Sequence, residues 1–150
     1  MANLLRFLPL KNQLFNNKGS IGYELPYNEW LKDITNSKFC FVIRGDTPTS
    51  HAFCNALSAG SIPVIISNHY DYVGLHFINK DLLNNAVIRF DENYFLQNPE
   101  KVINFLENIS KEKVIDLINN LNKLQQIFLY NHPNNIIDKM FLNKINFLLI

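Results

Sequence analysis

The segment Arg44–Ser50, which reads "RGDTPTS", concentrates groups that could bind an anion. The Arg44 guanidinium can make a bidentate, charge-assisted contact with a phosphate. The hydroxyls of Thr47, Thr49 and Ser50 can each donate a hydrogen bond. Gly45 would let the backbone turn sharply or approach a ligand closely. Together these residue types suit the binding of a phosphate group.

The same segment also has a purely structural interpretation. Ser50 or Thr49 could cap a following helix, Asp46 could stabilise an Asx-type turn, and Arg44 could be solvated. The residues of the segment leave both interpretations open. A Walker phosphate loop is excluded, because no Gly-Lys-Ser/Thr follows at the required spacing.

Two apolar runs flank the segment and predict the elements that position it. Phe39–Ile43 and Ile62–Ile66 are continuous, β-branched and aromatic runs, typical of strands covered on both faces. A helix is predicted from near Ser50 to Gly60, since glycine suits a helix C-terminus. Pro63 is tolerable near the beginning of the second strand. A strand, a loop, a helix and a strand in this order predict a βαβ unit on a parallel sheet.

This topology gives the polar segment a position that favours ligand binding. In open α/β sheets, ligands bind beyond the carboxyl ends of the strands, where loops lead into helix N-termini. The positive end of the helix dipole there favours an anion. The sequence therefore predicts an α/β fold, a Rossmann-like parallel sheet flanked by helices, with an anion site in the loop Arg44–Ser50.

The rest of the chain predicts further elements of the same kind. "YNEWLKDITN" is predicted to be a helix, Ala86–Phe90 a third parallel strand, and Asn98 the cap of another helix. The clearest helix follows Ser110, whose hydroxyl would cap it. Its predicted buried stripe comprises Val114, Leu117, Ile118, Leu121, Leu124 and Phe128. A final amphipathic helix is predicted to carry Ile137, Met140, Phe141 and Leu148.

Composition limits the classes of function. The 150 residues suit one domain, and the hydrophobic fraction of 47% and charged fraction of 18% are those of an ordinary globular protein. A formal charge of +1 argues against a nucleic-acid surface. No stretch is long and apolar enough to be a transmembrane segment, and the N-terminal residues have no convincing secretory signal.

Cysteines and histidines do not form a site by their spacing. Cys40 and Cys54 are expected to be buried thiols, without a disulfide framework. No pair of histidines has helical metal-ligand spacing, so no metal site is expected. His51, near the predicted helix start, could donate a hydrogen bond to a phosphate or sugar oxygen. The other histidines are expected to be structural or to lie on the surface; they are His69, His76 and His132.

The stretch Ser37–Ser67 resembles the signature of the exostosin family of glycosyltransferases. "SKFC", "RGDTPTS", Ala56 and "AGSIPVIIS" follow the order and spacing of that family. The resemblance implies a two-domain GT-B architecture, in which a C-terminal Rossmann-like domain holds the sugar-nucleotide donor. It implies that residues 1–150 form a single, N-terminally incomplete donor-binding domain resembling that C-terminal half.

The resemblance also implies which residues contact the donor. A UDP-sugar would bind as a substrate, with no cofactor, and the loop would face its diphosphate. The following helix, with His51 and Asn55, would face the nucleoside and sugar. The residues that match the family's loop are Arg44, Gly45, Asp46, Thr47, Thr49 and Ser50. Family members often carry an arginine where this chain has Ala52 and an acidic residue where it has Asn55, which supplies one acceptor oxygen instead of two.

The expected partners follow from the same resemblance. They are a nucleotide-sugar, a glycan acceptor and a missing N-terminal domain or partner chain, because no residue here is a candidate for acceptor binding or base catalysis. The resemblance suggests the secretory pathway or Golgi, although the chain shows no signal or anchor. The alternative functions are a non-catalytic or degenerate nucleotide- or glycan-binding module and an α/β interaction domain without a ligand.

Overall fold

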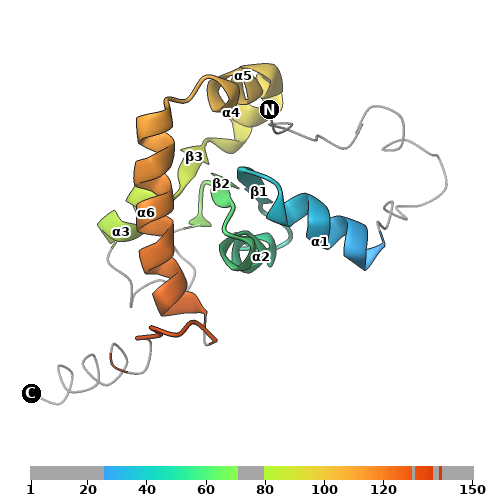
Figure 1. Cartoon of the computed structure of the whole chain (residues 1–150). Coiled ribbons are helices and arrows are strands. Elements are labelled where there is room, and N and C mark those ends of the chain that lie inside the picture. The colour runs from blue at the N-terminus through green and yellow to red at the C-terminus, as the bar shows by residue number, and fades with distance from the viewer. Residues whose placement is uncertain (1–25, 71–79, 130, 137–138, 140–150) are drawn as a thin grey trace, which may run out of the picture.

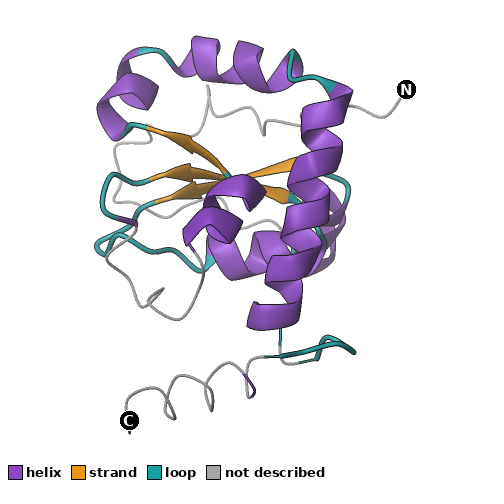
Figure 2. Ribbon diagram, turned by 90° about the vertical axis from the view of Figure 1, so that its left-hand side faces the viewer, coloured by secondary structure: helices purple, strands orange, loops and turns teal. Residues whose placement is uncertain are grey.

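The computed structural model describes residues 26–70, 80–129, 131–136 and 139 (Figure 1). Its elements in chain order are α1 (Tyr27–Thr35), β1 (Phe39–Ile43), α2 (Ala52–Ala59), β2 (Ile62–Ile66), α3 (Lys80–Ala86), β3 (Ile88–Phe90), α4 (Glu92–Gln97), α5 (Pro99–Glu107) and α6 (Lys111–Phe128). The strands form one parallel sheet in the order β1-β2-β3, with helices on both faces (Figure 2). The predicted α/β class, with a parallel sheet flanked by helices, is confirmed.

The three strands end at the same level of the sheet. The register pairs Ile43 with Ile66, and Ile66 with Phe90, so the last residues of β1, β2 and β3 lie side by side. The carboxyl ends of all three strands therefore share one edge, which we call the carboxyl edge. The segments that follow the strands begin together at this edge.

The core is divided between the two faces of the sheet. On one face, α2, α3 and α6 cover β1 and β2 with the buried residues Val42, Phe53, Leu57, Ile65, Leu83, Leu121 and Leu124. On the other face, α5 and the first half of α6 cover the sheet with Phe39, Ile62, Val64, Ile66, Ile88, Val102, Leu106 and Leu117. Figure 1 shows α6 running along the side of the sheet, from α5 at one face to α2 at the other. Because each such side chain contributes about 1.5–3 kcal/mol when fully buried, both faces stabilise the sheet.

Pro63 lies in the central strand without interrupting its hydrogen bonds. The Ile62 N–H donates to the Lys38 carbonyl over 2.9 Å, on the β1 side. Successive residues of a strand direct their backbone groups to opposite sides, so the Pro63 nitrogen faces β3. Pairing with β3 begins only at Val64, opposite Ile88. The missing N–H of proline therefore costs no hydrogen bond there.

The helix ends confirm two predictions and modify a third. Gly60 follows α2 with φ 72°, in the left-handed region that glycine adopts readily. The Ser110 hydroxyl accepts a hydrogen bond from the Lys113 N–H over 3.2 Å and caps α6. Asn98 precedes α5 as predicted, but its side chain donates to the Tyr94 carbonyl and does not cap the helix.

Two element predictions were wrong in detail. The third strand begins at Ile88, because Ala86 is the last residue of α3. A short apolar run cannot by itself be distinguished from the end of a buried helix. In α6, Ile118 is 37% exposed, whereas Ile127, at 7%, belongs to the buried face. The final helix predicted around Ile137, Met140, Phe141 and Leu148 lies outside the described residues.

The cysteines also differ from the expectation of two buried thiols. Cys40 is half-buried in β1, and burial raises the pKa of its thiol. Cys54 is exposed on α2, next to Phe53, which turns toward the core.

Among the helices of the described residues, none is long and apolar enough to cross a bilayer.

Candidate functional site

Polar residues follow all three strands at the carboxyl edge. β1 leads into Arg44, β2 into Ser67 and Asn68, and β3 into Asp91 and Glu92. Because the strands end at one level, these side chains lie at one place in the fold. This is the region in which open α/β sheets bind their ligands.

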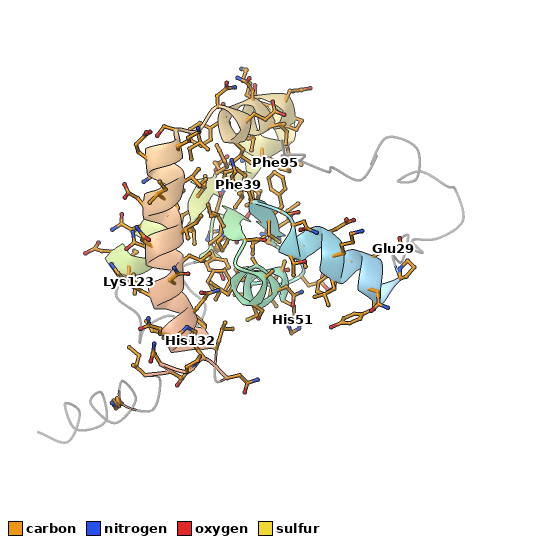
Figure 3. The ribbon with its side chains drawn as sticks, viewed as in Figure 1. Glu29, Phe39, His51, Phe95, Lys123 and His132 are labelled. Atoms are coloured by element: carbon orange, nitrogen blue, oxygen red, sulfur yellow. The ribbon has the colours of Figure 1, made fainter. Side chains whose placement is uncertain are left out.

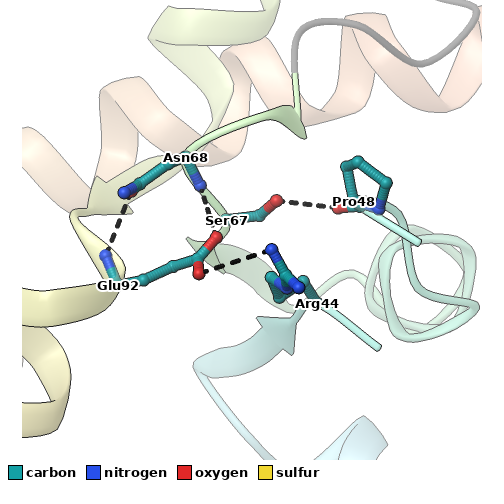
Figure 4. Close-up of polar contacts among 5 residues, drawn as sticks. All are labelled: Arg44, Pro48, Ser67, Asn68 and Glu92. Carbon is teal, nitrogen blue, oxygen red and sulfur yellow. Dashed lines mark hydrogen bonds and ion pairs between the residues drawn. The ribbon is translucent and has the colours of Figure 1, made fainter. Parts of the chain in front are cut away.

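Arg44 extends from β1 across the end of the sheet. Its backbone N–H donates to the Ile66 carbonyl over 3.2 Å, which continues the β1–β2 pairing by one residue. Its Nη1 atom lies 3.7 Å from Oε2 of Glu92, beyond the end of β3 (Figure 4). The Arg44 side chain is 44% exposed and that of Glu92 24%. Such a solvent-exposed ion pair contributes about 0–1 kcal/mol, so the guanidinium can exchange partners easily.

Glu92 is fixed by Asn68 at the end of the neighbouring strand. The Asn68 N–H donates to Oε1 of Glu92 over 2.9 Å, and the Glu92 N–H donates to Oδ1 of Asn68 over 3.1 Å. Asp91 caps α4 by accepting a hydrogen bond from the Tyr94 N–H over 2.9 Å, which lowers the pKa of its carboxyl. The end of β2 and the beginning of α4 are thus joined by reciprocal contacts.

The loop between β1 and α2 is held over the end of β2. The buried Ser67 hydroxyl donates to the Pro48 carbonyl over 2.8 Å (Figure 4). Thr47 donates to the Thr49 carbonyl over 3.1 Å. Gly45 does not have a positive φ, so the turn does not require glycine's conformational freedom. A Cβ at this position would meet nothing within 4 Å, so a ligand has room to approach the backbone.

The N-terminus of α2 follows this loop. The Ser50 hydroxyl accepts a hydrogen bond from the Ala52 N–H over 3.2 Å, but Ser50 lies one residue before the N-cap and is not the helix cap that the structural interpretation expects. Its own O–H remains able to donate to a ligand. His51 takes the N-cap position without a side-chain cap bond, and it is exposed (Figure 3). Asn55 is half-buried one turn further along α2.

The predicted site residues lie together because they are close in the sequence. They occupy the loop and the first turns of α2: Arg44, Gly45, Asp46, Thr47, Thr49, Ser50, His51 and Asn55. Ser67, Asn68 and Glu92 were not among the predicted site residues. All three follow predicted strands, so the rule that drew attention to the loop after β1 would also have identified the residues after β2 and β3.

The residues that the structure describes hold no group of three or more His, Cys, Asp or Glu side chains that could bind a metal ion. His132 accepts a hydrogen bond from the Asn134 N–H over 3.1 Å and stabilises a local turn. The carboxyl edge combines a half-exposed guanidinium, hydroxyl donors and a helix N-terminus, and this combination can bind an anion.

Comparison with known proteins gives one family match. The model of the Exostosin GT47 domain matches residues 10–104, which is more than half of the chain. The match includes all three strands, the loop after β1 and Glu92. No curated protein matches the chain.

Proposed function

The chain belongs to the exostosin GT47 family of glycosyltransferases, and we propose that its carboxyl edge binds the diphosphate of a sugar-nucleotide donor, a UDP-sugar. The observation that carries the proposal is the half-exposed Arg44 guanidinium, at the edge where the loop leads into the N-terminus of α2. Glycosyl transfer from such a donor leaves negative charge on the departing diphosphate. A guanidinium and fixed hydrogen-bond donors stabilise that charge.

The loop and the first turns of α2 divide the contacts with the donor in this proposal. Arg44 contacts a phosphoryl oxygen, and the hydroxyls of Thr49 and Ser50 donate to the same group together with backbone N–H groups of the loop. The dipole of α2 adds a favourable field for the anion. His51 and Asn55 face the nucleoside and sugar. Since Asn55 supplies one acceptor oxygen, it receives fewer hydroxyl hydrogen bonds than a carboxylate would.

We further propose that residues 1–150 act as the donor-binding half of a GT-B enzyme. A glycan acceptor and the catalytic base would then come from a second domain or chain. No residue of this chain is assigned a catalytic role. A second candidate, a non-catalytic nucleotide- or glycan-binding module, is favoured by Ala52 and Asn55. Family members often carry an arginine at the first of these positions and an acidic residue at the second.

Titration calorimetry with UDP and uridine tests the diphosphate site. Charge-assisted hydrogen bonds contribute about 1.5–3 kcal/mol, so Arg44→Ala should weaken UDP binding about tenfold or more. Uridine binding should be unchanged, because uridine carries no phosphate. Lys32→Ala, an exposed change on α1, removes one positive charge elsewhere and serves as the control. If UDP does not bind at millimolar concentration, or binds no better than uridine, the proposal is wrong.

A further inference from the structure

The guanidinium that the proposed function assigns to the diphosphate already has an anionic neighbour within the chain. Oε2 of Glu92 lies 3.7 Å from Nη1 of Arg44 (Figure 4). The other carboxylate oxygen accepts from the Asn68 N–H over 2.9 Å, and the Glu92 N–H donates back to the Asn68 side chain. These contacts keep the negative charge of Glu92 at the carboxyl edge, close to Arg44.

A diphosphate at Arg44 would meet this carboxylate in two ways. It would replace Glu92 as a partner of the guanidinium, and it would be repelled by the Glu92 charge. The repulsion rises with the charge of the ligand. Free UDP carries a terminal phosphate whose second pKa is about 6, so at neutral pH it bears about one more negative charge than a UDP-sugar. The Glu92 carboxylate therefore repels the product of transfer, free UDP, more strongly than it repels the donor.

We propose that Glu92 competes with the diphosphate for Arg44 and favours release of the free nucleoside diphosphate after transfer. This inference rests on the proposed function. Glu92 sets the affinity of the site and its preference between donor and product. The ion pair is exposed enough to exchange, while the contacts with Asn68 keep Glu92 close to Arg44 for the next exchange.

The variant Glu92→Gln separates the charge from the local structure. Glutamine keeps an acceptor oxygen for the Asn68 N–H and removes the negative charge. Calorimetric titrations should show UDP binding about twofold to fivefold more tightly than in the wild type, in line with an exposed ion pair of up to about 1 kcal/mol. The gain for UDP-glucose, with its smaller charge, should be smaller. Glu107→Gln, an exposed change at the end of α5, is the control and should bind both ligands as the wild type does.

The outcomes separate this inference from the proposed function. If UDP binding depends on Arg44 but Glu92→Gln binds UDP equally or less tightly, the competition is wrong and the proposed function stands. Equal gains for UDP and UDP-glucose would overturn the preference for product release. If the wild type does not bind UDP, both ideas fail. If Glu92→Gln does not fold, Glu92→Asp replaces it, because its side chain is one methylene shorter and its charge lies farther from Arg44. The inference then requires that Glu92→Asp binds UDP more tightly than the wild type.

Discussion

Ser61 connects three segments at the amino end of the sheet, opposite the carboxyl edge. Its side chain is 0% exposed, and its hydroxyl lies 2.8 Å from the Ile34 carbonyl and 2.7 Å from the Ser37 carbonyl. The hydroxyl has one proton, so it donates to one of them at a time. The Ile34 carbonyl also accepts from the Ser37 N–H over 3.2 Å, so the Ser37 carbonyl depends more on Ser61. The change Ser61→Ala removes this donor.

We expect Ser61→Ala to lower the free energy of unfolding by about 1–2 kcal/mol. A net hydrogen bond contributes about 0.5–1.5 kcal/mol, and a carbonyl left without a partner adds to the loss. Urea denaturation followed by circular dichroism measures this change. With an m value of about 2 kcal/mol/M, the midpoint should fall by about 0.5–1 M. The affinity of the folded variant for UDP should not change, because Ser61 precedes β2 and Arg44 lies at its other end.

Ser58→Ala is the matched control, since Ser58 is exposed on α2. Its free energy of unfolding should lie within about 0.5 kcal/mol of the wild-type value. An unchanged midpoint for Ser61→Ala would refute the assigned hydrogen bonds. A loss of UDP affinity without a loss of stability would refute the prediction that Ser61, at the amino end of the sheet, does not affect binding at the carboxyl edge.

Four further outcomes are expected. Ser110→Ala removes the cap of α6 and should cost about 1 kcal/mol in the same urea assay. The Tyr94 N–H lowers the pKa of Asp91, so the Asp91 carboxylate stabilises the fold above the ordinary carboxyl pKa, and this stabilisation is lost as pH falls through the lowered pKa. Asp91→Asn should therefore remove that part of the acid dependence of the urea midpoint. Exposed Cys54 should react quickly with a thiol reagent and half-buried Cys40 slowly, and Cys54→Ser should abolish the fast phase. The purified chain alone should give no acceptor-dependent product with radiolabelled sugar nucleotides, because the proposed acceptor site and base lie elsewhere.

Local signals explain why much of the fold could be predicted. The strands Phe39–Ile43 and Ile62–Ile66 are uniformly apolar over the length of a strand, and their bounds match the prediction. Gly60 and Ser110 act on the backbone within a few residues, so their effects can be deduced from the adjacent sequence. The beginning of the third strand was predicted wrongly because Ala86 is buried equally well at the end of a helix.

Tertiary contacts explain what could not be predicted. Ile118 and Ile127 are both apolar, but Ile118 is 37% exposed and Ile127 is 7% exposed, and apolar character alone does not distinguish them. The pairing of Arg44 with Glu92 joins residues that follow different strands, and local spacing contains no sign of it. The loop, and by the same strand-end rule Glu92, could therefore be identified from the sequence, whereas the ion pair between Arg44 and Glu92 required the structure.

An NMR titration of the ¹⁵N-labelled chain with UDP tests the central claim most directly, because it reports where the ligand binds. The account predicts that the largest chemical-shift changes occur at the carboxyl edge, in the loop from Arg44 to His51 and at Asn68 and Glu92. Ser61 and its neighbours at the amino end of the sheet should change little. No change at millimolar UDP, or the largest changes away from the carboxyl edge, would contradict the account.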